Sequence, residues 1–380
     1  MIKNIFNGNL NKLHIMNSIE GLGWSMIGIF IPIYLLILGY TLKQVFVYYI
    51  IQNLVILLTA FLIVFLGRVI SIQKVLIVRF PFLLIFLILL YNLQDLNFSI
   101  YYLAIIAGFQ LMLYWFPLHI LFSQFADKNN MGSSTSKLFA IPQFVSMFGP
   151  LAGGLITVAW GFKILFIIAT VLFFIAYIPV LFTKITPIKY SFKFKEGLEL
   201  YKKYKKYFYS EISNNVGEEV EGIIWPIFVY LSLINIASVG LIGTLLAVSS
   251  SIFTLIVGRL ADKKNKIKMI RISALFIMII WFLRFALDNE LAFYILTVCS
   301  GIVFVVLSVP YYSIFYQIAQ KEKAAVFFAF REIPVTIARI IVFSLGILFA
   351  ANLKILFLAA GLAYILFIFW KKQENNEIIN

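Results

Sequence analysis

Residues 44–67 read QVFVYYIIQNLVILLTAFLIVFLG and carry no charged side chain. A bilayer's hydrocarbon layer is about 30 Å thick, and an α-helix rises about 1.5 Å per residue, so roughly 20 apolar residues can cross it. Strands of a membrane barrel alternate apolar and polar residues over about ten positions. This run has no such alternation and is much longer. The stretch therefore predicts a membrane-spanning helix.

The whole chain has the composition that this stretch indicates. Of its 380 residues, 63% are hydrophobic and 12% are charged, against about 45–50% and about 25% in soluble domains. We predict an all-α polytopic membrane protein that is embedded in the lipid bilayer. Its twelve predicted spans are 13–38, 44–67, 75–92, 98–124, 137–160, 162–183, 208–234, 238–261, 268–287, 290–320, 323–350 and 352–370.

The basic residues predict how the spans are oriented. The chain has 31 lysines and arginines and a formal net charge of +15. With the N-terminus inside, 25 of them fall in inner segments, and only Lys43, Lys163 and Lys354 fall in outer ones. This is the positive-inside pattern, so we expect both termini in the cytoplasm and the protein in the cytoplasmic membrane. The charge is thus an orientation signal, and we expect no nucleic-acid partner. Arg79 and Arg284 are expected to snorkel from span ends to the interface.

One long connection divides the chain. Residues 184–207 read KITPIKYSFKFKEGLELYKKYKKY. We predict an N-terminal six-span bundle at 1–183, a basic cytoplasmic linker at 184–207 and a C-terminal six-span bundle at 208–380. The linker is expected to form an amphipathic helix on anionic inner-leaflet lipid, and the alternative is a solvated linker.

The two halves repeat each other. Prolines and glycines recur at separations of 191 to 194 residues, and a shared spacing of prolines is informative because prolines are costly inside helices. Each match joins spans of the same direction, so the repeat is parallel. The pairs are Pro32 with Pro226, Gly67 with Gly258, Pro117 with Pro310 and Pro142 with Pro334.

The segment 258–266 reads GRLADKKNK and resembles the loop motif G-x-L-a-D-r-x-g-r-k of the major facilitator superfamily. Asn265 replaces the glycine of the motif. The first-half copy, GRVIS at 67–71, has Ser71 where an acid is expected.

The resemblance implies two six-helix bundles around a central cavity, with alternating access. In the motif, Gly258 would allow close helix approach, beside Arg259. Asp262 would latch a neighbouring helix end or basic side chain in one state. The alternative for Asp262 is a surface ion pair.

A second motif lies in the fifth predicted span. Residues 149–154 read GPLAGG and look like part of the antiporter motif G-x-x-x-G-P-x-x-G-G of drug-exporting relatives, with Val145 at the first glycine position. Gly149 and Pro150 would then act in gating. The alternative is close packing of helices through small residues.

Ionisable side chains inside spans are costly and usually face a cavity or one another. In the seventh span, Glu211, Asn214, Asn215, Glu218 and Glu221 form one stripe, Trp225 extends it, and Glu219 is expected to point elsewhere. We predict that a cavity binds the solute and protons through Glu20, Trp24, His119, Asn214, Glu218, Glu221, Trp225, Arg331, Glu332 and Arg339. The alternative is a set of inter-helix ion pairs, such as Glu218 with Arg331 or Arg339.

These features predict a secondary active transporter that moves a small organic solute, with protons or another coupling ion. The carboxylates outnumber the arginines, which favours a cationic or zwitterionic solute. The sequence has no GxxxxGK[ST], HExxH or GxSxG motif, one cysteine and two histidines, so we expect no enzyme, ATP drive, metal or cofactor. We expect a monomer. The alternatives are a multidrug-type efflux antiporter, a non-transporting membrane sensor or scaffold, and a membrane-embedded enzyme.

Overall fold

The computed structural model describes residues 9–67, 69–96, 98–181 and 192–370. Throughout these ranges the chain forms helices joined by short turns, and they contain no strand. Residues 184–191 of the predicted linker lie outside the described ranges. So do four other basic residues that were counted in the inner segments: Lys3, Arg68, Lys371 and Lys372.

The first half of the chain contains helices α1 to α7. The first rod is α1 (Asn9–Ile27), the short turn η2 (Gly28–Phe30) and α2 (Ile31–Ile37). The next elements are α3 (Leu42–Leu66), α4 (Ile72–Tyr91), α5 (Ile100–Phe125), α6 (Met131–Ser146) and α7 (Gly149–Leu181). Helix α7 turns back on itself at Gly161, whose φ of 82° suits a residue without a Cβ.

The second half begins with the linker helix α8 (Phe194–Lys203). The next rod is α9 (Lys205–Glu219), the π-helical turn η3 (Val220–Ile224) and α10 (Trp225–Leu233). The remaining helices are α11 (Ile236–Lys263), α12 (Lys266–Ala286), α13 (Glu290–Lys321), α14 (Ala324–Leu348), α15 (Lys354–Ala363) and α16 (Ile365–Ile368).

Each of the twelve predicted spans corresponds to a helical rod in the described residues, once rods broken by a kink are taken together. Within the described ranges, eight helices are long and apolar enough to cross a membrane, and one of them, 131–178, contains the Gly161 turn. The seventh, eleventh and twelfth rods are not among the eight, and the twelfth, Lys354–Ile368, is a shorter apolar helix. The seventh is interrupted by η3, and α14 carries Arg331, Glu332 and Arg339.

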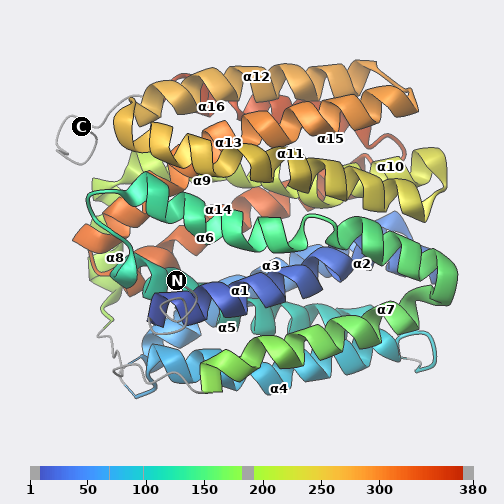
Figure 1. Ribbon diagram of the computed structural model, residues 1–380, viewed down its shortest axis with the longest axis horizontal. Coiled ribbons are helices and arrows are strands. Elements are labelled where there is room, and N and C mark those ends of the chain that lie inside the picture. The colour runs from blue at the N-terminus through green and yellow to red at the C-terminus, as the bar shows by residue number, and fades with distance from the viewer. Residues whose placement is uncertain (1–8, 68, 97, 182–191, 371–380) are drawn as a thin grey trace, which may run out of the picture.

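The rods form two bundles that meet along a central interface (Figure 1). Helix α3 of the first half packs on α14, and α6 and α7 pack on α11. Where α7 crosses α11, a Cβ on Gly154 would lie 3.5 Å from the Cα of Gly240, so small residues let the two helices touch. Helix α1 begins and α16 ends at the same end of the bundle, which we call the basic end; the opposite end is the far end.

The parallel repeat also appears in two ion pairs at the far end. Lys163 binds Asp95 at 2.6 Å in the first half, and Lys354 binds Asp288 in the second. The lysines are 191 residues apart and the aspartates 193, which are the separations found for the prolines and glycines. Topologically equivalent turns thus carry the same pair.

The helix in the predicted linker lies on the protein at the basic end. A Cβ on Gly197 would lie 1.9 Å from the ring of Phe330, so α8 fits against α14 only because that residue is a glycine. Glu322, in the turn before α14, accepts hydrogen bonds from Lys203 and Tyr204, each 2.6 Å long. Burial raises the pKa of Glu322, but these two bonds together with the charges of Lys203 and Lys321 hold that pKa below its ordinary value. Helix α8 is therefore anchored to the second bundle.

The charge asymmetry predicts which end faces the cytoplasm. In a Cys299→Ser background, we expect Ala351→Cys at the far end to react with a membrane-impermeant maleimide in intact cells. Lys264→Cys at the basic end should react only after permeabilisation, since the positive-inside rule places it inside. Both positions are exposed in the structure. Labelling of residue 264 but not 351 in intact cells would contradict the orientation.

Candidate functional site

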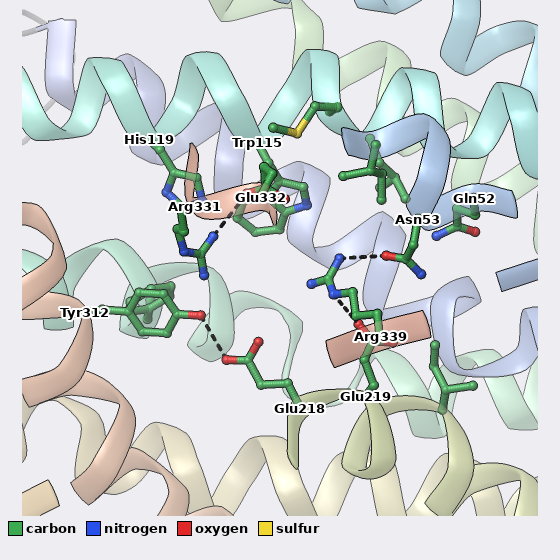
Figure 2. Close-up of a pocket in the computed structure, with 15 residues that line it drawn as sticks. Gln52, Asn53, Trp115, His119, Glu218, Glu219, Tyr312, Arg331, Glu332 and Arg339 are labelled. Atoms are coloured by element: carbon green, nitrogen blue, oxygen red, sulfur yellow. Dashed lines mark hydrogen bonds and ion pairs between the residues drawn. The ribbon is translucent and has the colours of Figure 1, made fainter. Parts of the chain in front are cut away.

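A cavity of about 340 Å³ lies at the interface of the two bundles (Figure 2). Helices α3, α5 and α6 form one side, and α9, α13 and α14 form the other. Five of the residues predicted for the site line it: His119, Glu218, Arg331, Glu332 and Arg339. Three aromatic side chains, Trp115, Phe139 and Tyr312, line it as well.

Both arginines of α14 are paired with carboxylates. Arg331 lies 3.0 Å from Glu211 and 3.3 Å from Glu332. Arg339 lies 2.8 Å from Glu219 and donates a hydrogen bond to Asn53 of α3, at 3.1 Å. Inter-helix ion pairs of the kind given as the alternative therefore occur here, but their carboxylates are Glu211 and Glu219 and not Glu218. The expectation that Glu219 points elsewhere is wrong. The Arg339–Asn53 bond also joins the two bundles across the cavity.

Glu218 is the carboxylate of the cavity that is not ion-paired. Its side chain accepts a 2.9 Å hydrogen bond from the hydroxyl of Tyr312 (Figure 2). The amide of Asn214 donates a second bond to it, also 2.9 Å long. None of the ion pairs found among the described residues within 4.0 Å includes it. A carboxylate in a low-dielectric cavity without an ion-pair partner of its own is costly, although Arg331 and Arg339 line the same cavity. This carboxyl group is thus the one most open to neutralisation by a proton or by a cationic ligand.

Glu20 and Trp24 lie away from the cavity, inside the first bundle. Glu20 forms an ion pair with Arg79 of α4, and both side chains are almost completely buried. Arg79 also donates to Gln110 at 3.0 Å and to the hydroxyl of Tyr177 at 3.0 Å. The expectation that Arg79 snorkels is wrong, because its guanidinium group is buried and three other helices of the bundle, α1, α5 and α7, supply its partners.

The second bundle contains a comparable pair. Arg284 of α12 binds both oxygens of Glu221, at 2.6 and 3.0 Å, and its side chain is fully buried. The guanidinium lies 4.1 Å from the ring centroid of Trp225. Arg284 therefore does not snorkel either, and Glu221 and Trp225 belong to this pair rather than to the cavity lining. Each bundle thus joins its first span to its third by a buried Glu–Arg pair.

The polar stripe of the seventh span divides at the π-helical turn. Glu218 and Glu219 end the regular α-helix, and Val220–Ile224 then has the wider π geometry. The 3.6-residue period on which the predicted stripe rests does not hold beyond Glu219. Glu221 consequently faces α12, while Asn214 and Glu218 remain together.

Contacts between the bundles close the cavity toward the basic end. His119 of α5 shares a 2.7 Å hydrogen bond with the hydroxyl of Tyr316 of α13. One helical turn farther toward the basic end, the amide of Gln320 donates to the carbonyls of Ser123 and Ala126, at 2.8 and 3.0 Å. These bonds join α5 to α13 on the side of the cavity that faces the basic end.

Asp262 fastens the same end from the other side of the interface. Its carboxylate accepts hydrogen bonds from the backbone N–H groups of Gly132 and Ser133, at 2.7 and 2.9 Å, and from the Ser133 hydroxyl at 2.6 Å. These groups form the first turn of α6, where backbone N–H groups have no partner within the helix. Gly258 lies against Ser136, with no room for a Cβ. Arg259 is exposed.

Gly149 and Pro150 lie where α1, α7 and α11 meet. A Cβ on Gly149 would lie 1.9 Å from the hydroxyl of Ser25 of α1. The carbonyl of Pro150 would lie 2.6 Å from a Cβ on Gly240 of α11. Close packing through small residues therefore occurs at this motif.

No protein-family model and no curated protein matches this sequence. Solved structures do share its fold. A bacterial homologue of the iron transporter ferroportin, in an outward-facing state with soaked iron, has a TM-score of 0.70 at 16% identity, over 96% of this chain and 100% of that chain. The major facilitator transporter FucP of E. coli, in its outward conformation, has a TM-score of 0.70 at 11% identity, over 96% and 98%. The human organic anion transporter MFSD10 has a TM-score of 0.68 at 10% identity, over 95% and 98%.

The chain has the major facilitator fold. These matches confirm the predicted fold class over nearly the whole chain. The cavity between the bundles and the contact of Asp262 with α6 are thus features of this fold as this sequence builds it.

The buried pairs of the two bundles predict large effects on stability. We expect Arg79→Met to lower the free energy of unfolding by about 3–5 kcal/mol, because Glu20 would remain buried without its cation. The double variant Glu20→Gln/Arg79→Met should recover more than half of that loss. Equilibrium unfolding in mixed micelles measures both.

Lys163→Met is the control, since it breaks an ion pair whose two side chains are 38% and 50% exposed, and exposed pairs contribute little. Equal losses for Arg79→Met and Lys163→Met would show that the buried pair does not hold the bundle together.

Proposed function

We propose that this protein is a secondary active transporter that moves a small organic solute by alternating access and couples the movement to protons. The observation that carries the proposal is Glu218, a carboxyl group in a cavity between the two bundles with neutral hydrogen-bond partners. Desolvation favours the neutral form of such a group, so it can take up and release a proton as water reaches it from either side.

The charges of the cavity favour a cationic or zwitterionic solute. Among the residues that line it, Glu218, Glu219 and Glu332 face two arginines, and Arg331 also binds Glu211. Glu20 and Glu221 do not add to this excess, because Arg79 and Arg284 neutralise them. The rings of Trp115, Phe139 and Tyr312 offer aromatic faces, which attract organic cations. A solute with an ammonium group would meet both features.

Alternating access requires the basic end to open while the far end closes. In this conformation, Asp262 and the bonds of His119 and Gln320 hold the basic end together. Asp262 binds neutral groups of α6, so an opening movement that separates α6 from α11 would expose its carboxylate to water at modest cost. We infer that Asp262 stabilises the state closed at the basic end.

Two other functions remain as alternatives. An efflux antiporter is favoured by the segment 149–154, whose glycines and proline lie at the junction of α1, α7 and α11. A non-transporting sensor or scaffold is compatible with Ser71, which stands where the first-half motif would have an acid. A sensor or scaffold gives no role to a cavity carboxyl group that lacks an ion-pair partner, whereas a proton-coupled efflux antiporter would use it in the same way as the proposed transporter.

The role of Glu218 predicts a specific defect. A panel of small amines, quaternary ammonium ions and amino acids would be screened at two pH values by thermal stability of the purified protein. A solute at 100 times its dissociation constant should stabilise the wild type by about 2.7 kcal/mol. In Glu218→Gln we expect the protein to fold, but solute-driven proton movement into liposomes to be lost.

Glu199→Gln is the control, because Glu199 is exposed on α8. If Glu218→Gln moves protons with solute as the wild type does, the proton site is elsewhere. If no solute stabilises a well-folded sample at either pH, the sensor or scaffold function replaces transport.

A further inference from the structure

A second cavity lies outside the interface, on the lipid-facing side of the first bundle. It is a groove of about 420 Å³ between α4 and the second part of α7, which run side by side along the lower edge of Figure 1. The wall from Leu84 to Asn92 rises about 12 Å along α4. The apolar side chains that form it are Leu84, Leu87, Ile88, Ile167, Val171 and Phe174.

Two polar side chains of the groove, Thr170 and Asn92, donate hydrogen bonds within their own segments. The hydroxyl of Thr170 donates to the carbonyl of Phe166, and the amide of Asn92 donates to that of Ile88. Ile88, Val171 and Phe174 are 58%, 53% and 49% exposed. The groove therefore presents an apolar wall to the membrane along its length.

A pair of opposite charges lies at the far-end mouth of this groove. The ammonium of Lys163 lies 5.4 Å from the ring centroid of Tyr91, which lines the groove, and 2.6 Å from Asp95. Both charged side chains are substantially exposed, so their mutual attraction is weak. They can accept a ligand that itself carries a phosphate and an ammonium group.

The second bundle closes the equivalent space with its own side chains. At the separations that relate the two halves, Ile88 corresponds to Trp281, and Thr170 corresponds to Gly361. Trp281 is 1% exposed and its ring lies 5.5 Å from that of Phe357. A Cβ on Gly361 would lie 2.8 Å from the ring of Phe282. The groove of the first bundle is thus open, while aromatic rings fill the equivalent space in the second bundle. Both bundles carry the Lys–Asp pair.

We propose that this groove is a binding site for a zwitterionic phospholipid of the phosphatidylethanolamine type. One acyl chain lies between α4 and α7, the phosphate binds Lys163, and the ammonium binds Asp95. An anionic headgroup would leave Asp95 facing a negative charge. A choline headgroup would offer no N–H to its carboxylate.

Native mass spectrometry of the purified full-length protein tests this site. Phosphatidylethanolamine, phosphatidylcholine and phosphatidylglycerol with identical acyl chains would be added in turn. We expect the first to bind with the highest occupancy. Val171→Trp, which fills the groove, and Lys163→Ala should each reduce that occupancy about tenfold, because they remove the space for the chain or the partner of the phosphate.

Matched controls come from the second bundle. Lys354→Ala removes the equivalent lysine of the second bundle, where Trp281 packs on Phe357, and Leu348→Trp adds a ring at a position that is 74% exposed. Neither should change the occupancy. Equal binding of the three lipids, unaffected by Val171→Trp, would show that only annular lipid covers the groove and would overturn the proposal. Preferential binding of phosphatidylglycerol would overturn the zwitterionic assignment. Thermal unfolding of each variant confirms that it is folded.

Discussion

The structure depends on the cost of placing charge in a membrane. A charge in the hydrocarbon layer must find a partner or neutralise, and the three buried arginines of the spans and the partly buried Arg339 all have partners. Arg79 and Arg284 bind glutamates within their own bundles, while Arg331 and Arg339 bind glutamates around the cavity. Glu218 is the carboxyl group of the cavity that this pairing leaves over. The same constraint therefore rigidifies each bundle and leaves one titratable group at the interface between them.

This division of roles suits a protein whose two halves move against each other. The pairs Glu20–Arg79 and Glu221–Arg284 join helices of the same bundle, so a rocking movement does not break them. The contacts that such a movement must break are of another kind. Asp262 binds backbone N–H groups of α6, and His119 and Gln320 bind neutral groups of the facing bundle. Neutral partners cost less to exchange for water than a buried ion pair.

The sequence was sufficient to predict the fold, because the spans, the basic end and the repeat follow from composition and spacing. It located the cavity only in part. Five of the ten residues that were predicted to bind solute and protons line it, and their roles stay predictions: His119, Glu218, Arg331, Glu332 and Arg339. Periodicity alone could not show that the stripe turns away after Glu219, since no residue type marks the π turn. It also could not show that Arg79 reaches Glu20 across the first bundle, because partners distant in sequence have no shared pattern. The repeated Lys–Asp pairs at offsets of 191 and 193 were present in the sequence and could have been found.

We propose that the two bundles alternate between closing the basic end and closing the far end. Spin-label distances measured in nanodiscs test it most directly, with one pair at Lys128 and Lys321 and another at Lys43 and Ser232, all exposed positions. We expect Asp262→Asn to add a population in which the Lys128–Lys321 distance is longer and the Lys43–Ser232 distance is shorter. If each of the two distances has a single distribution that neither Asp262→Asn nor a change of pH alters, the bundles do not alternate.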